Sequence, residues 1–240
     1  MAPGKLSTFF MTTKTKPRFF KNRPIPQPNP EKAFAKDTHY KHLDSYDFTD
    51  VVKAFDRRIK YWYFYHAKEL VPKQHQGFAI VVIVSVIIDL LSQFIYGTQE
   101  SSARIYKCFL RKYIPEFRKK IKPPLKSYRH VHDNGWKMEL IKDFADAFYH
   151  AVRCGVVHSA MILDYAGIAG EDEVPKGRVI CCNPWGDGKR EVAVNPFVLL
   201  ERAEQAFDQY IEKLQNPANK SLRQKFAKKF YRSFGKKIKP

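Results

Sequence analysis

The stretch that most constrains the fold runs from Phe78 to Leu91, where nearly every side chain is apolar. A helix that is apolar all round is either buried at the centre of a globular protein or inserted in a membrane. Spanning a bilayer takes about 20 apolar residues, whereas Asp89, Ser92 and Gln93 interrupt this run. The many β-branched residues would also suit a strand, but the length favours a helix. The stretch therefore predicts a buried core helix.

One polar stripe follows this helix, because its polar side chains recur at three- and four-residue steps: Ser85, Asp89, Ser92, Gln93 and Tyr96. A buried carboxylate must find a partner or become protonated. Asp89 is therefore either part of a local hydrogen-bond network or faces a cationic residue of a functional site. Both interpretations remain open from the sequence.

The remaining periodicity predicts further helices over residues 47–70, 101–113 and 136–167. Asp47 is the expected N-cap of the first of these helices. Residues 115–135 are basic and contain the Pro123-Pro124 step, so they are expected to form a loop.

The apolar pattern changes near the C-terminal end. Two short runs, 178–182 and 191–194, flank a turn-forming segment and predict a β-hairpin. Asn195-Pro196 then supplies an N-cap and a first-turn proline for a last helix that stops at Asn216-Pro217. The predicted fold is mainly α, an up-and-down helical bundle with a small β-hairpin inserted before the last helix.

The net charge of +19 over 240 residues is concentrated in three segments. Residues 1–41 contain nine Lys and Arg against two acidic residues, and residues 217–240 contain nine against none. Residues 104–129 contain ten against one. Repeated prolines between residues 24 and 30 remove backbone donors, so 1–41 is expected to be a basic disordered arm. The predicted organisation is this arm, a helical domain over 42–216 and a basic tail over 217–240.

Basic segments around a near-neutral body indicate a polyanionic partner, because each Lys or Arg that neutralises a phosphate releases counterions. RNA, DNA and anionic lipid all fit, and basic tails that only keep the protein soluble are the alternative. The candidate nucleic-acid-binding residues are Lys119, Lys120, Lys122, Lys228 and Lys229. The N-terminal residues lack the apolar segment of a secretory signal, so a cytoplasmic protein is expected.

The predicted fourth helix contains the block Arg153-Cys154-Gly155, which follows the aromatic pair Phe148-Tyr149 and precedes His158. In this sequence pattern the chain resembles the HEPN superfamily of all-helical domains, whose signature is Arg-x4-6-His on the helix before the last. The Asn-Pro step that opens the final helix and the phrase Leu91–Phe94 add to the likeness, which covers roughly residues 45–215. Many catalytic members place Asn, Asp or His directly after the Arg, where this chain has Cys154.

The resemblance implies a metal-independent endoribonuclease that forms a homodimer, with its Arg/His pairs meeting in one cleft. It also implies a toxin or antiphage-defence effector, with a cognate antitoxin or regulatory protein. Cleavage by the 2′-hydroxyl of the RNA needs a general base, a general acid and a cation on the phosphate. His158 would do the proton transfer, and Arg153 would hold the phosphate oxygens. The alternative is a catalytically inactive HEPN-like module that binds nucleic acid or protein.

The spacing of the pair carries a geometric condition. Residues five apart in an ideal helix point about 140° apart, so Arg153 and His158 need either a turn loosened at Gly155 or residues of a second chain. Asp89 could then orient one of them. Alternatively, Arg153 pairs with Asp89 for structural reasons and His158 is a core histidine. Cys154 and His150, which lies one turn before Arg153, are supporting candidates.

Neither a metal nor a cofactor is expected. The cysteines lack the paired spacing of a zinc site, and the two histidines His130 and His132 lie in the basic segment that is expected to form a loop. Aromatic residues between 226 and 234 interleave with Lys and Arg, a pattern that also suits a helix lying on a membrane surface. RNA is the favoured partner and a membrane the disfavoured one.

Overall fold

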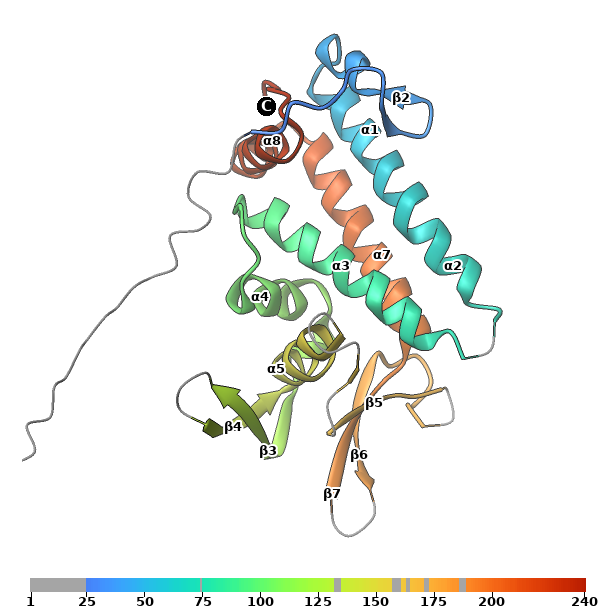
Figure 1. The fold of residues 1–240 in the computed structure, drawn as a ribbon, viewed down its shortest axis with the longest axis vertical. Coiled ribbons are helices and arrows are strands. Elements are labelled where there is room, and N and C mark those ends of the chain that lie inside the picture. The colour runs from blue at the N-terminus through green and yellow to red at the C-terminus, as the bar shows by residue number, and fades with distance from the viewer. Residues whose placement is uncertain are drawn as a thin grey trace, which may run out of the picture.

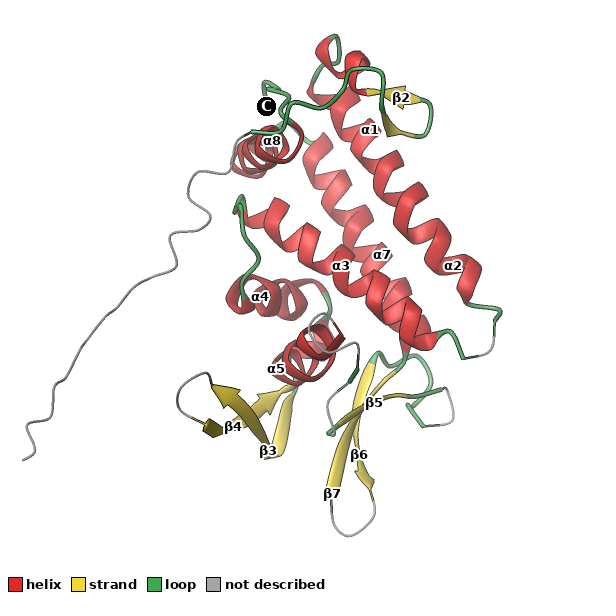
Figure 2. Cartoon of the chain, viewed as in Figure 1, coloured by secondary structure: helices red, strands yellow, loops and turns green. Residues whose placement is uncertain are grey.

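The computed structural model describes residues 25–73, 75–131, 135–156, 161–162, 165–170, 173–185 and 189–240. The fold is mainly α-helical, as predicted, with the long helices at one end of the molecule and two of the three small sheets at the other (Figure 1). Figure 2 shows the same division by type of secondary structure. One apolar core extends from the helices into both of these sheets.

The core is built around α3 (Gly77–Tyr96), which packs against α7 (Pro196–Gln215), α4 (Ala103–Tyr113) and α8 (Lys220–Phe234). It is the single helix in the described part of the chain that is long and apolar enough to cross a membrane. Of its most apolar window, 56% is buried inside the protein. The predicted core helix is therefore confirmed.

Side-chain caps set the starts of the main helices where the sequence places them. Asp47 accepts a hydrogen bond from the Asp50 amide at 2.8 Å ahead of α1 (Phe48–Ile59). Asn195 accepts from the Phe197 and Val198 amides at 3.0 and 3.1 Å ahead of α7. The first predicted helix continues from α1 through a π-helical segment, Lys60–Tyr65, into α2 (His66–Leu70).

The C-terminal segment is not a tail outside the domain, which corrects the boundary at residue 217. It forms α8, and its aromatic face carries Phe226 and Phe230 into the core with no exposed surface. The Phe226 ring packs against Phe55 and Phe94 at centroid distances of 5.3 and 5.4 Å. The aromatic face that suggested a membrane-surface helix is thus already covered by the protein.

Residues 25–41 are part of the same fold, so the predicted disordered arm does not extend to residue 41. β1 (Ala33–Ala35) pairs with β2 (Thr38–His39), and a 3-10 helix, Tyr40–Asp44, follows. Phe34 is fully buried, with its ring 5.6 Å from Phe230 and 5.1 Å from Phe234. One aromatic side chain therefore holds this segment on α8. The predicted arm over 1–24 lies outside the described residues.

The predicted loop over 115–135 is largely a β-hairpin, the second correction. A 3-10 turn, Pro115–Arg118, leads into β3 (Lys120–Val131), which pairs antiparallel with β4 (Gly135–Asp143). A register shift between Lys120 and Leu125 accommodates the two prolines. In β4, buried Ile141 and Asp143 alternate with exposed residues, a period of two that the charge of the region obscures.

The fourth helix therefore begins later than predicted, because β4 occupies residues 135–143. It starts at α5 (Phe144–Ala147), capped by Asp143, and continues as a π-helical segment, Phe148–Cys154. It does not reach Gly167, which lies in β5 (Ala166–Ile168).

The predicted hairpin before the last helix is present as β6 (Ile180–Trp185) and β7 (Lys189–Val194). β5 adds a third strand parallel to β7, which the sequence pattern did not indicate. Arg190 of β7 donates to the carbonyl oxygens of Lys122 and Pro123, the former at 2.9 Å. This contact ties the two sheets together.

Candidate functional site

Asp89 and Arg153 meet where α3 passes the π-helical segment Phe148–Cys154. Asp89 Oδ1 lies 3.6 Å from Arg153 Nη2, and the two side chains are 23% and 15% exposed. The guanidinium also lies 5.6 Å from the centre of the Tyr149 ring. The Arg153–Asp89 pairing that the sequence left open is therefore present. π-Helical turns inside helices occur frequently at functional sites.

The Arg153 guanidinium keeps hydrogen-bonding capacity despite this pairing. A separation of 3.6 Å exceeds hydrogen-bond length, so the contact with Asp89 is between charges. Arg153 Nε is buried and has no hydrogen-bond partner among the described residues. Burial alone would lower the pKa of Arg153, but Asp89, Tyr149 and Cys154 together outweigh burial and raise it. The site thus holds a permanent cation with unused donors.

Asp89 is fixed by one neighbour on its own helix, Gln93, and by one outside it, Ser101. Its Oδ1 accepts from the Ser101 hydroxyl, and its Oδ2 accepts from Gln93 Nε2 at 3.1 Å. The Lys229 ammonium donates to Gln93 Oε1 at 2.7 Å and to the Gln99 carbonyl at 3.3 Å. A polar chain therefore runs from α8 through α3 to Arg153.

Lys229 does not meet the prediction of a surface contact with nucleic acid. It is 7% exposed, and its ammonium is engaged by Gln93 and Gln99. Burial lowers the pKa of Lys229, although Asp89 partly offsets this. Its neighbour Lys228 is exposed on the opposite face of α8 and remains available to solvent.

Two buried hydroxyl groups border the Arg153–Asp89 pair. Ser85 Oγ and the Tyr106 phenol lack hydrogen-bond partners in the described part of the chain. Burial raises the pKa of Tyr106 far above its usual value, so its phenol stays neutral. Unsatisfied buried polar groups are rare in proteins. Their grouping beside a half-paired Arg153 marks this region as the polar centre of the molecule.

The other half of the predicted catalytic pair, His158, lies outside the described residues, so its distance to Arg153 stays a prediction. Cys154 is half-buried beside Arg153, and its thiol favours the charged guanidinium. His150 lies with its Nε2 3.7 Å from Glu139 Oε1 on β4 and packs edge-on against the Tyr149 ring. His150 thus faces the β3–β4 sheet, whereas Arg153 faces α3.

A second feature of the surface is a basic groove between the start of β3 and the β6–β7 hairpin, with a volume of about 510 Å³. Five cationic side chains line it: Lys119, Lys120, Lys122, Arg178 and Arg190. Three of these are the lysines predicted to bind nucleic acid. Lys120 also lies 3.5 Å from Asp143 but stays largely exposed.

No family model matches the chain, and no curated protein or solved structure matches it.

The sequence interpretation missed Arg178 and Arg190, which complete the groove from the β6–β7 side. Their positions in the sequence carry a usable signal, since Arg190 lies in β7 and Arg178 lies two residues before β6 of the correctly predicted hairpin. The sequence pattern did not predict the hairpin β3–β4. Without this hairpin, no predicted element places residues 119–122 near residues 178–190. The cysteines Cys181 and Cys182 also line the groove, and burial raises the pKa of both thiols.

The described residues hold no group of three or more His, Cys, Asp or Glu side chains that could bind a metal ion. All four cysteines are free thiols. His130 is described only as a position in β3, and His132 lies outside the described residues.

Proposed function

We propose that this protein binds RNA in the groove lined by Lys119, Lys120 and Lys122, and cleaves it as a metal-independent endoribonuclease through Arg153 and His158. The proposal rests on the HEPN resemblance and includes its fold, an up-and-down helical bundle with a hairpin inserted before the last helix. It also includes a cytoplasmic homodimer that acts as a toxin or antiphage-defence effector, regulated by a cognate antitoxin or other protein.

The observation that carries RNA binding is the basic groove. Arg178 and Arg190 converge on Lys119–Lys122 across a gap of more than fifty residues in sequence, and none of the described residues that line the groove is acidic. Such a cluster attracts a phosphate backbone and releases its counterions. Arginines add bidentate contacts to phosphate oxygens that lysines cannot make.

The chemistry assigned to Arg153 fits its surroundings. Cleavage by a 2′-hydroxyl builds extra negative charge on the phosphate, and a guanidinium in a poorly hydrated site stabilises that charge strongly. Asp89 acts as a positioning residue, since it holds Arg153 without using all of its donors. His158 supplies the proton transfers, as general base to the hydroxyl and as general acid to the leaving 5′-oxygen.

The decisive experiment incubates purified protein with labelled single-stranded RNA in EDTA. We expect cleavage by the full chain and a loss of at least 100-fold in His158→Gln, since general acid–base catalysis contributes about 10²–10⁴-fold. His66→Gln, a change at an exposed histidine on α2, is the matched control and should retain full activity. RNA binding without any cleavage, in every variant, would contradict the endoribonuclease proposal.

A second candidate function is a catalytically inactive HEPN-like module that binds nucleic acid or protein. The Arg153–Asp89 pairing favours it, because a paired and mostly buried guanidinium also serves a purely structural role. In that case RNA binding would be lost in a Lys119→Gln/Lys122→Gln variant, while no RNA product would appear with any protein. Lys53→Gln/Lys68→Gln, on the α1–α2 face, is the charge-matched control.

A further inference from the structure

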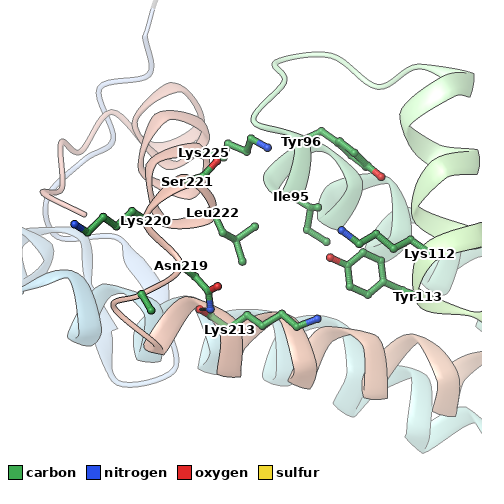
Figure 3. Close-up of a pocket in the computed structure, with 11 residues that line it drawn as sticks. Ile95, Tyr96, Lys112, Tyr113, Lys213, Asn219, Lys220, Ser221, Leu222 and Lys225 are labelled. Atoms are coloured by element: carbon green, nitrogen blue, oxygen red, sulfur yellow. Dashed lines mark hydrogen bonds between the residues drawn. The ribbon is translucent and has the colours of Figure 1, made fainter.

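A second basic cavity lies away from both sites discussed so far. It has a volume of about 420 Å³ and sits between the C-terminal ends of α3, α4 and α7 and the first turns of α8 (Figure 3). Four lysines from three helices line it: Lys112, Lys213, Lys220 and Lys225. None of the described residues that line the cavity is acidic.

These lysines differ from others of the molecule in having no carboxylate partner. Lys60, Lys68 and Lys107 each form an ion pair within 3.2 Å of an Asp or Glu oxygen. None of the four cavity lysines has an ion pair with any described residue. Positive charges gathered at one cavity without a counter-charge repel one another, and an anion in the cavity would relieve that repulsion.

The side chains are arranged around a common space. Figure 3 shows the ammonium ends of Lys112 and Lys225 turned toward it from opposite sides, with the Tyr113 hydroxyl on the same side as Lys112. The Lys112 and Lys213 ammonium groups lie 5.4 and 5.6 Å from the centre of the Tyr113 ring. Burial raises the pKa of Tyr96 and Tyr113, so both phenols keep their protons and can donate hydrogen bonds near neutral pH.

The start of α8 adds to the positive potential. Asn219 occupies the N-cap position, but its side chain donates to the Lys213 carbonyl at 2.9 Å and makes no capping hydrogen bond. The first amides of α8 are thus not capped by Asn219, and the positive end of the helix dipole lies at the cavity. This feature supports the lysine cluster and would not define a site alone.

The size of the cavity suits a small organic molecule. A volume of about 420 Å³ is within the usual range for small-molecule sites. Two apolar side chains, Ile95 and Leu222, lie between the lysines (Figure 3). The cavity therefore suits a small molecule that has both a strongly anionic group and an organic group.

We infer that this cavity binds a small molecule that carries a diphosphate group. Two linked phosphates carry about three negative charges near neutral pH, which matches the unpaired ammonium groups of Lys112, Lys213 and Lys225. Tyr113 donates to a phosphate oxygen, and Ile95 with Leu222 contact the organic part. This inference does not depend on RNA cleavage or on the basic groove.

The test is calorimetric titration of the full chain with pyrophosphate. We expect saturable binding of one pyrophosphate, weakened about tenfold by Lys112→Gln and by Lys225→Gln, since each removes a charge-assisted contact. Orthophosphate should bind more weakly, and ADP at least as tightly as pyrophosphate if the apolar pair contributes. Lys119→Gln, in the other groove, is the matched control and should leave pyrophosphate binding unchanged.

Absence of pyrophosphate binding at millimolar concentration would overturn the inference, as would binding that Lys112→Gln and Lys225→Gln leave intact. Both lysines are exposed, so these variants are expected to fold, and thermal unfolding checks this. Titration of the same variants with single-stranded RNA shows whether the cavity lysines bind RNA instead of a small anion. If Lys112→Gln and Lys225→Gln lose RNA binding while the wild type does not bind pyrophosphate, the cavity belongs to a surface for a polymer and the inference is wrong.

Discussion

Asp143 joins the end of β4 to the start of the helix that carries Arg153. Its Oδ1 caps α5 by accepting from the Asp146 amide at 2.9 Å, and both its oxygens accept from Arg111 Nη2 at 3.0–3.1 Å. Burial alone would raise the pKa of Asp143, but the Asp146 amide and Arg111 outweigh it and hold the pKa below its usual value.

We expect Asp143→Asn to destabilise the protein by about 1–3 kcal/mol at pH 7, the cost of losing charge-assisted hydrogen bonds. The folded pKa is below 3.8, so the contribution of the carboxylate is complete well above that pH and is lost as the pH falls through the folded value. The difference from the wild type should therefore shrink as the pH falls below about 4. Urea unfolding between pH 3 and 7 measures it. Asp50→Asn, an exposed aspartate on α1, should show no more than about 0.5 kcal/mol at any pH.

The Arg153–Asp89 pair predicts energetic coupling between two elements that are distant in sequence. Removing one partner leaves the other charged and poorly hydrated. The stability losses of the two single variants should therefore add up to more than the loss in the double variant. A double-mutant cycle of Asp89→Asn and Arg153→Met, measured by chemical unfolding, should give a coupling energy of about 0.5–3 kcal/mol. Strictly additive effects would show that the 3.6 Å contact does not contribute to stability.

At the scale of elements, α8 determines whether the helical core is complete. Phe226 and Phe230 have no exposed surface, and α8 also supplies the Lys229 that engages Gln93. Exposed side chains of α8 and of the residues after it carry most of the basic charge of residues 217–240, so a high charge and a structural role coexist in one segment.

We expect Phe230→Ala to lower the free energy of unfolding by about 3–5 kcal/mol, the usual range for truncating a buried Phe. Lys228→Ala, two positions away on the exposed face, should change it by no more than about 0.5 kcal/mol. Guanidinium unfolding followed by circular dichroism makes the comparison. Equal effects of the two changes would mean that α8 does not belong to the cooperative core.

How far the sequence predicts this fold depends on which signal each element carries. The starts of α1 and α7 follow from the caps Asp47 and Asn195, because capping is local chemistry that the sequence displays directly. The hairpin β3–β4 does not follow, although its two strands are neighbours in sequence, since its prolines and lysines resemble a loop. The same holds for α8, whose lysines hide an apolar face that only the presence of Phe34, Phe55 and Phe94 explains.

For the candidate site, the sequence indicates that Asp89 is a buried carboxylate that needs a partner. It also indicates Arg153 as one candidate for that partner. It does not indicate Ser101 or Lys229, because these reach the pair through tertiary contacts with Asp89 and Gln93. Nor does it separate Lys228 from Lys229, which differ only in the helix face that they occupy.

At the scale of the whole molecule, the described residues form two basic cavities that share no lining residue. The groove beside β3 is lined by five cationic side chains. For single-stranded RNA, the logarithm of the binding constant falls with the logarithm of salt concentration by about 0.7 per neutralised phosphate.

Full engagement of the groove therefore predicts a salt slope of about −3.5 for a short single-stranded RNA. Lys119→Gln/Lys122→Gln should reduce the steepness by about 1.4, whereas Lys53→Gln/Lys68→Gln should leave it unchanged. Fluorescence anisotropy at several salt concentrations gives the slopes. A slope that the groove variant does not alter would assign RNA binding to another surface.

The contact of Phe34 with Phe230 and Phe234 has a practical consequence for splitting the polypeptide. Residues 25–44 and α8 hold each other through this contact, and the turn between α7 and α8, Asn216–Asn219, is exposed apart from the half-buried Asn219. A fragment that ends at residue 216 and a peptide that starts at 217 should consequently recombine into one particle when mixed. Such complementation would let assembly be switched on by adding the peptide.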